Sequence, residues 1–363
     1  MSTMNTNRYS EKNRNHLTAI DLFCGAGGLT LGLKQAGFSV VAGIELDPIA
    51  AESYKMNHTD TFCIQEDIRK VDPKGLMKLL GLKRGELSLL AGCPPCQGFS
   101  TLRTYKKERS VSDERNNLLF EYLKFIEIFY PKAIMMENVP ALANDWRMQK
   151  FKTKLQELGY LITDSSVRVE NAADYGVPQR RRRMIMLVIR DQKAPLAPKS
   201  KHVSVGECFS KAALKPVGMQ NDPLHDKLTK HTDKIQEIIR SIPKDGGSRT
   251  SLPEHLVLPC HKRRTNGFRD VYGRMRWNDV APTITGGCTN PSKGRYLHPF
   301  EDRAISLREA ALLQTFPIDY KFSFRGGKGR VALMIGNAIP PEFIKRHASI
   351  LAEILKESKQ HEQ

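Results

Sequence analysis

Short apolar runs alternate with amphipathic segments from Thr18 to Arg190. The runs have the length and composition of buried β-strands, and the segments between them repeat apolar residues at helical spacing. Strands are predicted at Thr18–Phe23, Phe38–Ile44, Thr61–Ile64, Leu87–Ala91, Ala133–Met136 and Met184–Ile189. Helices are predicted at Leu29–Ala36, Pro48–Asn57, Asn117–Phe129 and Trp146–Leu158. This alternation is typical of an α/β protein with a mostly parallel sheet, so we expect a Rossmann-like domain.

The pattern changes after Arg190. Residues 191–300 are rich in Pro, Lys, Gly and Ser, and Leu228–Ile242 is the clearest helix there. Periodicity returns at Leu307–Leu313, and Pro341–Leu355 is predicted to be a closing helix that packs back on the first domain. We therefore divide the chain into a flexible tail (1–16), a first domain (17–190), a smaller irregular domain with its hinge (191–318) and a return to the first domain (319–363).

The chain of 363 residues carries a formal charge of +18. This excess favours a polyanionic partner such as nucleic acid, because Lys and Arg contacts to phosphates supply most non-specific affinity. A generally basic surface is the alternative. No apolar run approaches the roughly 18 residues needed to cross a bilayer, and residues 1–16 lack an apolar signal-peptide core. We expect a cytoplasmic protein without membrane contact.

A glycine-rich segment, Asp21-Leu-Phe-Cys-Gly-Ala-Gly-Gly, follows the first predicted strand and opens the first predicted helix. Its glycines allow main-chain amides to approach a ligand closely and present a helix N-terminus to it. The spacing of Gly25, Gly27 and Gly28 differs from the Gly-x-Gly-x-x-Gly pattern of nicotinamide dehydrogenases. A turn with a purely structural role remains the alternative.

Acidic residues end the next two predicted strands. Glu45 follows the second strand, where a carboxylate can hold ribose hydroxyls. Asp67 and Ile68 follow the third strand in a polar turn. Together with the glycine-rich segment, these positions predict an adenosine-binding site.

The segment Gly92-Cys-Pro-Pro-Cys-Gln-Gly-Phe-Ser follows the strand at Leu87–Ala91. Its two prolines stiffen the loop and leave Cys96 beyond the carboxyl edge of the sheet, where a thiolate can act as a nucleophile. Cys93 and Cys96 are the only close pair among seven cysteines, which do not form a disulfide framework and fit a reducing compartment. Half a zinc site, a redox dithiol and two inert buried cysteines remain alternatives; no metal site is predicted.

Two further segments carry polar residues to the same sheet edge. Glu137 closes the strand at Ala133–Met136, where it is placed for acid–base chemistry. A run of four arginines leads into the strand at Met184–Ile189. If the run is extended, Arg181 and Arg183 share one face and could hold a pyrimidine carbonyl or a phosphate. A helix-capping Glu and a solvated basic run are the alternatives.

These motifs, in this order from Asp21 to Pro341, resemble the bacterial cytosine-5 DNA methyltransferase family. The matching residues are Phe23, Gly25, Gly27, Glu45, Asp67, Pro94-Pro95-Cys96-Gln97, Glu137-Asn138-Val139, Gln179, Arg181, Arg183, Arg308–Pro317 and Gly336-Asn337-Ala338-Ile339-Pro340. One position departs from the family, which usually has Arg where Leu312 stands. We expect that difference to affect local packing and not the chemistry.

The resemblance implies methyl transfer from S-adenosylmethionine to carbon 5 of a flipped-out cytosine in a short duplex DNA sequence, in a restriction-modification system. Cys96 is expected to attack carbon 6, Glu137 to contact N3 and the amino group, and Arg183, supported by Arg181, to hold O2. The residues expected to contact the cofactor are Phe23, Gly25, Gly27, Gly28, Glu45, Asp67, Ile68 and Asn337. We expect a monomer that binds double-stranded DNA and needs no protein partner.

The irregular second domain is expected to read the target sequence. Candidates for base contacts lie at His261–Asn266 and Arg274–Arg276, and Thr283-Ile-Thr-Gly-Gly resembles a segment near the end of such modules. The polar segment Gly98–Arg115 is expected to close over bound DNA, or else to be a plain surface loop.

Three other functions compete with this prediction. An RNA cytosine-5 methyltransferase is disfavoured by the large insert after Arg190. A non-catalytic DNA-binding protein is disfavoured because Cys96, Glu137 and Arg183 are all present. A nicotinamide enzyme leaves the cysteine loop and the arginines without a role.

Overall fold

The structure is a computed structural model that describes residues 16–95, 118–262 and 270–361. The chain folds into two compact units. Unit 1 contains the chain up to Asn171, Arg182–Lys199 and the segment from Pro341 onward. Unit 2 contains Ala172–Arg181 and Ser200–Pro340.

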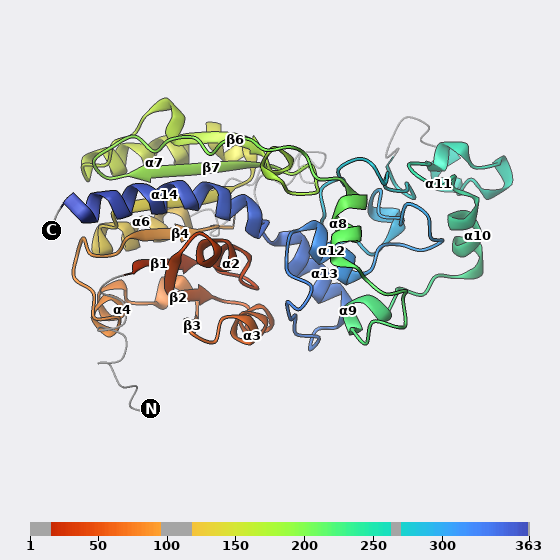
Figure 1. Cartoon of the computed structure of the whole chain (residues 1–363), viewed down its shortest axis with the longest axis horizontal. Helices are drawn as coiled ribbons and strands as arrows, with labels where there is room; N and C mark the ends of the chain where they lie inside the picture. Colours follow the sequence, from red (N-terminus) through yellow and green to blue (C-terminus); the bar gives the residue numbers. More distant parts are fainter. Residues whose placement is uncertain (1–15, 96–117, 263–269, 362–363) are drawn as a thin grey trace. The chain divides into compact units, whose positions relative to one another are not determined.

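Unit 1 is built on a seven-stranded sheet with the strand order β3-β2-β1-β4-β5-β7-β6 (Figure 1). Its strands are β1 (Leu17–Leu22), β2 (Phe38–Glu45), β3 (Phe62–Gln65), β4 (Leu89–Gly92), β5 (Ala133–Asn138), β6 (Val167–Asn171) and β7 (Arg182–Ile189). The first five strands are parallel, whereas β7 runs antiparallel to both β5 and β6. The expected Rossmann-like α/β architecture with a mostly parallel sheet is confirmed.

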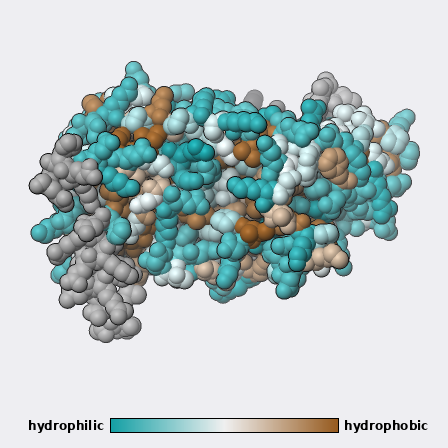
Figure 2. Space-filling model, viewed as in Figure 1, coloured by the Kyte–Doolittle hydropathy of each residue, from teal (hydrophilic) through white to brown (hydrophobic). Residues whose placement is uncertain are grey.

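The sheet is packed against helices whose apolar faces complete the core. The helices of unit 1 are α2 (Gly28–Gln35), α3 (Pro48–Asn57), α4 (Pro73–Leu79), α6 (Leu118–Phe129), α7 (Trp146–Glu157) and α14 (Pro341–His361). The hydroxyl of Tyr122 on α6 donates to the carbonyls of Leu90 and Met135, which ties that helix to β4 and β5. Hydrophilic residues predominate on the face drawn in Figure 2, as burial of the apolar strands requires.

The predicted return of the last helix to the first domain is confirmed. A Cβ atom at Gly32 of α2 would lie 2.6 Å from Cβ of Ile344 on α14, so the two helices touch where glycine leaves space. The return begins at Pro341, however, and not at residue 319 as expected. Residues 319–340 belong to unit 2. One contact that holds them there is the hydrogen bond from Nε2 of Gln314, which follows α12, to the carbonyl of Ile335 on α13, at 2.6 Å.

Unit 2 is irregular, as predicted, and its helices are short. They are α8 (Val205–Ala212), α9 (Pro223–Asp226), α10 (Asp233–Ser241), α11 (Pro259–Lys262), α12 (Leu307–Leu313) and α13 (Gly327–Asn337). The helix predicted at Leu228–Ile242 begins only at Asp233, after the N-cap residue Thr232. The strand β6 and the helices α4, α8, α9, α11 and α13 were not predicted.

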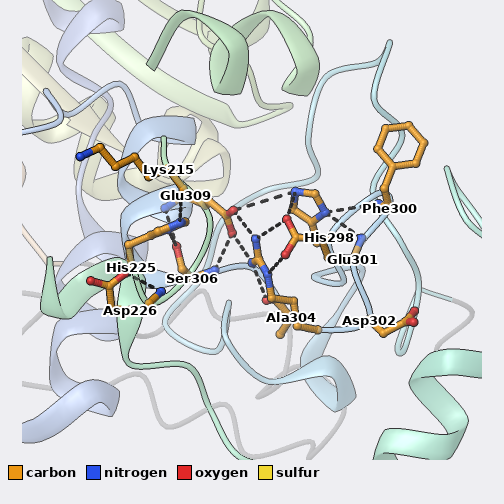
Figure 3. A network of polar contacts seen from close by, with 12 residues as sticks. Lys215, His225, Asp226, His298, Phe300, Glu301, Asp302, Ala304, Ser306 and Glu309 are labelled. Carbon is orange, nitrogen blue, oxygen red and sulfur yellow. Dashed lines mark hydrogen bonds and ion pairs between the residues drawn. The ribbon is translucent and has the colours of Figure 1, made fainter. Parts of the chain in front are cut away.

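A buried polar network holds the centre of unit 2 together (Figure 3). Both carboxylate oxygens of Glu309 accept from Arg303, each at 2.7 Å, and one also accepts from the N–H of Ser306. The hydroxyl of Ser306 is 2.9 Å from Nδ1 of His225. Glu309 is 3% exposed, so the removal of Arg303 would leave a buried carboxylate without the guanidinium that pairs with it. The acidic residue of the predicted Arg308–Pro317 motif therefore has a structural role here.

Candidate active site

The parallel strands of unit 1 bring the predicted site residues to one edge of the sheet. The registers pair Leu22 with Ile44 and with Gly92, and Gly92 with Met136, so β1, β2, β4 and β5 end at the same side. Ligands of open α/β sheets bind at this carboxyl edge. The glycine-rich segment and the cysteine loop follow β1 and β4, and Glu45 and Glu137 lie in the last two residues of β2 and β5.

The glycine-rich segment turns sharply between β1 and α2. Phe23 has a φ of 64°, and Gly25 and Gly27 have φ of 55° and 99°, in the left-handed region that glycine adopts without strain. Apart from its chain neighbours, no atom of the described residues lies within 4 Å of where a Cβ of Gly25 would be, so the main chain there borders open space among these residues. Gly27 is the N-cap of α2, which has no side-chain cap. Main-chain amides at this end of α2 are placed to face a polar ligand.

Glu45 links the glycine-rich segment to the end of β2. Its Oε2 accepts from the N–H of Gly25 and its Oε1 from the N–H of Asp47, both at 2.8 Å. Leu46 follows directly and is 64% exposed. A carboxylate beside an exposed apolar side chain is suited to a nucleoside, whose sugar is polar and whose base is flat and apolar. Sequence reasoning missed Leu46, although its position after Glu45 could have indicated it.

The acidic residue after β3, Asp67, forms an ion pair and a helix cap. Asp67 caps the short helix at Ile68–Lys70, and its Oδ2 accepts from Nη2 of Arg69 at 2.6 Å. This pairing and the bond from the Arg69 N–H lower the pKa of Asp67. The side chain of Ile68 is buried in the core, so any ligand contact would come from its main chain.

Asp21, near the end of β1, is an acidic residue in the core beside the start of α2. Asp21 is completely buried, and its Oδ2 accepts from the hydroxyl of Thr30, which is also bonded to the hydroxyl of Tyr54. Burial raises the pKa of Asp21 to about 8. Asp21 therefore positions the first turns of α2 as a neutral acid near pH 7.

The cysteine loop is tied to the neighbouring strand end. The side-chain amide of Asn138 donates to the carbonyl of Pro94 at 2.8 Å, so β5 positions the loop after β4. A Cβ at Gly92 would lie 2.7 Å from the carbonyl of Leu22, which explains the glycine. Burial raises the pKa of the Cys93 thiol well above its ordinary value. Cys93 is thus not activated, whereas Cys96 and the segment Gly98–Arg115 lie outside the described residues.

Glu137 and Arg183 meet across two paired strands. Nε of Arg183 is 2.9 Å from Oε1 of Glu137, and the side chains are 18% and 10% exposed. The antiparallel register of β5 and β7 produces this contact, because it pairs Glu137 with Ile185. A carboxylate and a guanidinium side by side offer an acceptor and donors on one side of a planar heterocycle.

Other predicted site residues lie in unit 2. Arg181 is 2% exposed and donates to the carbonyls of Ile284 and Gly336, both at 2.9 Å. Because β7 begins at Arg182, the argument that Arg181 and Arg183 share a strand face does not apply. Asn337, the last residue of α13, also belongs to unit 2. The cofactor contact predicted for Asn337 and the supporting role predicted for Arg181 stay predictions.

One base-reading candidate is wrong. Arg274 is completely buried and donates to four main-chain carbonyls, among them those of Ile239 and Ile242, and to the carboxylate of Asp302. Its donors are used inside unit 2, so it has no group left for a base edge. Arg276 is exposed and remains a candidate. The segment His261–Asn266 is described only as far as Lys262.

The described ranges hold neither a metal-type cluster nor a membrane-spanning helix. Within residues 16–95, 118–262 and 270–361, no three His, Cys, Asp or Glu side chains gather as a metal site would need. No helix in these ranges has the length and apolar character required to cross a membrane.

The sequence is similar to one protein family and to its members over most of its length. The profile of the family described as "C-5 cytosine-specific DNA methylase" matches residues 17–353. The chain is 38% identical over 333 residues to the Type II methylase M.HgiDII of Herpetosiphon aurantiacus, covering 88% of this chain and 91% of that protein. It is 31% identical to the Type II methyltransferase M1.HphI of Haemophilus parahaemolyticus, and the match covers 90% of this chain and 84% of that protein.

Solved structures share the fold. A putative DNA modification methyltransferase encoded within a prophage of E. coli has a TM-score of 0.66 at 23% identity, covering 93% of this chain and 99% of that one. The S. pombe Dnmt2 methyltransferase has a TM-score of 0.60 at 18% identity, covering 93% and 99%. At these identities the likeness concerns the fold alone.

Proposed function

The chain belongs to the C-5 cytosine-specific DNA methylase family, and from this membership we propose how its own residues perform the reaction. Its activity is DNA cytosine-5 methylation, with S-adenosylmethionine as the methyl donor of the family. The single observation that carries the residue assignment is the Glu137–Arg183 pair at the carboxyl edge of the sheet.

The residues at the ends of β1, β2 and β3 fit the cofactor. The open space at Gly25 admits a ligand, and Glu45 is held at the end of β2 by two main-chain N–H groups. We assign cofactor binding to the glycine-rich segment with Phe23, to Glu45 and Leu46, and to Asp67 and the main chain of Ile68. When bound, S-adenosylmethionine supplies an electrophilic methyl group.

The reaction begins with a nucleophile on the loop that Asn138 positions. The target cytosine leaves the helix, because carbon 6 of a stacked base is out of reach. The thiolate of Cys96 attacks carbon 6, which breaks the aromatic system and makes carbon 5 electron-rich. After methylation, loss of the carbon 5 proton and expulsion of the thiolate restore the ring.

Glu137 and Arg183 stabilise the charge that this attack develops. Glu137 contacts N3 and the amino group of cytosine, and Arg183 contacts the O2 carbonyl. Groups that are already oriented before the substrate arrives do not have to reorganise during the reaction. The contact between the two side chains supports such an orientation.

The biological setting is proposed from the names of the relatives, both of which are Type II enzymes. The protein would protect host DNA in a restriction-modification system, acting on duplex DNA. The predictions of a monomer, of independence from protein partners and of a cytoplasmic location stay predictions.

Bisulfite sequencing tests the proposed function directly. Plasmid DNA is incubated with the purified protein and S-adenosylmethionine and then sequenced after conversion. Protected cytosines confined to one short sequence are expected. The absence of any protected cytosine, with folded protein and varied duplex DNA, would contradict the proposal.

A further inference from the structure

A cavity of about 620 Å³ lies within unit 2, and its lining includes neither Glu137 nor Arg183, the two described residues assigned to catalysis. Three separate segments form its walls: the chain after α9, the loop that leads into the short helix Pro291–Lys293, and the first turn of α13. The polar side chains in its lining are Thr229, Lys230, Thr289, Asn290, Lys293 and Lys328. These segments are distant in sequence, so the fold alone brings the three lysines together.

The charge of this cavity is of one sign. Among the described residues, its lining contributes three ammonium groups and no Asp or Glu. Within the part of the chain that the structure describes, none of the three lysines forms an ion pair with a carboxylate. Lys328 is anchored, because its Nζ donates to the carbonyl of Leu228 at 2.7 Å, whereas Lys230 and Lys293 are exposed. Clustered cations without carboxylate partners attract an anion.

The uncharged groups of the lining are also suited to an anion. Oδ1 of Asn290 accepts from the N–H and the hydroxyl of Ser292, which leaves the NH₂ group of Asn290 as a donor. Gly329 lies in the first turn of α13, and no atom of the described residues outside its own turn of the helix lies within 4 Å of where its Cβ would be. Helix α13 has no side-chain N-cap, so its first turn adds main-chain donors and a partial positive charge.

We propose that this cavity binds phosphates of the duplex DNA backbone and anchors unit 2 on the substrate, apart from the contacts to the target cytosine. The inference rests on the proposed function. A phosphodiester is favoured over a free nucleotide, because the described residues of the lining include no aromatic side chain that could stack on a base. Contacts of this kind position a protein on DNA without reading its sequence.

The test measures non-specific binding, which depends mainly on phosphate contacts and needs no knowledge of the target sequence. The full-length protein is titrated onto a fluorescent duplex of random sequence at several NaCl concentrations. The main variant is Lys230→Gln/Lys293→Gln, because both side chains are exposed and their loss should not disturb folding. The matched control is Lys211→Gln/Lys234→Gln, which removes the same charge from exposed positions of unit 2 outside the cavity.

We expect the main variant to lower the slope of log K against log salt by about 1 to 2, since each lost phosphate contact removes about 0.9. The control should change the slope by less than about half of that. Adding Lys328→Gln should weaken binding further. Equal slopes for both double variants, or no change in either, would overturn the proposal.

Two further measurements distinguish a site for DNA phosphates from a site for a free phosphate compound. Inorganic phosphate and ATP are titrated against the DNA complex and against the free protein. Binding of ATP that the main variant loses, with an unchanged DNA salt slope, would assign the cavity to a free phosphate compound and overturn the proposal. Bisulfite sequencing at low salt should still detect methylation by the variants, so failure of this inference is distinguishable from failure of the proposed function.

Discussion

Arg183 Nε lies 2.9 Å from Oε1 of Glu137, although the two residues come from strands that are far apart in sequence. Each partner offsets the charge of the other in a site that is largely closed to solvent. The pair is therefore formed before substrate binds, and the antiparallel register of β5 and β7 determines it. In the proposed mechanism the same groups contact N3 and O2 of the flipped cytosine.

Substitution of this pair should slow the chemical step. Glu137→Gln and Arg183→Met are each expected to lower the single-turnover rate of methyl transfer by about 10²–10³-fold, as loss of a preorganised polar group does elsewhere. The double variant should lose less than the product of the two effects, because the residues act as a unit. Labelled S-adenosylmethionine and plasmid DNA provide the assay. A single variant within threefold of wild type would contradict the assignment.

Arg181 is expected to act on stability more than on the chemical step. Arg181→Ala leaves the buried carbonyls of Ile284 and Gly336 without their donor, which should lower the free energy of unfolding by on the order of 3 kcal/mol. Arg182→Ala is the matched control, since that side chain is exposed. Urea unfolding of both variants distinguishes the roles. Equal unfolding midpoints for the two variants would contradict the stabilising role of Arg181.

Cys96 should be the only cysteine that methyl transfer requires as a nucleophile. Cys96→Ala is expected to abolish turnover while DNA binding and cofactor binding remain. Cys93 is not expected to take over, because burial raises its thiol pKa. Cys260→Ala, which removes an exposed thiol of unit 2, serves as the control and should retain activity. Turnover by the Cys96 variant would rule out the covalent mechanism.

Glu45→Gln should weaken cofactor binding. The change removes a charged acceptor from the N–H groups of Gly25 and Asp47 and from the ribose, so we expect the Kd for S-adenosylmethionine to rise by roughly 10–100-fold. Isothermal titration calorimetry measures this directly. Glu157→Gln is the control, because that residue forms only an exposed ion pair with Lys154. Similar Kd values for both variants would argue against the assigned site.

His58 should make the protein sensitive to mild acid. It is buried at 2% exposure beside the carbonyl of Gly27, and burial lowers its pKa to about 4. The unfolded chain takes up this proton near pH 6.5, so stability falls as the pH drops from about 6.5 to about 4, by at most about 3 kcal/mol. His58→Gln should reduce that loss, measured as the difference between urea midpoints at neutral and acidic pH. If His58→Gln left the difference between the two urea midpoints unchanged, the loss of stability in acid would be caused by other groups and not by His58.

The hydrophobic pattern by itself determined much of unit 1. Strands such as Phe38–Glu45 and helices such as Pro48–Asn57 were predicted to within a residue, because apolar periodicity and a Pro near the helix start are local signals. The order of motifs likewise determined the family and the candidate residues. The edge strand β6, by contrast, has the sequence Val-Arg-Val-Glu-Asn and lacks a continuous apolar run, so it was missed.

The tertiary structure decided which charges meet. Arg183 and Arg274 are both arginines near a predicted site, yet one pairs with Glu137 and the other is completely buried against main-chain carbonyls. The same holds for Lys230, Lys293 and Lys328, which share one cavity although they are distant in sequence. A residue's type and its local pattern indicate what it can bind, whereas its partners depend on contacts between segments that are brought together only when the whole core forms.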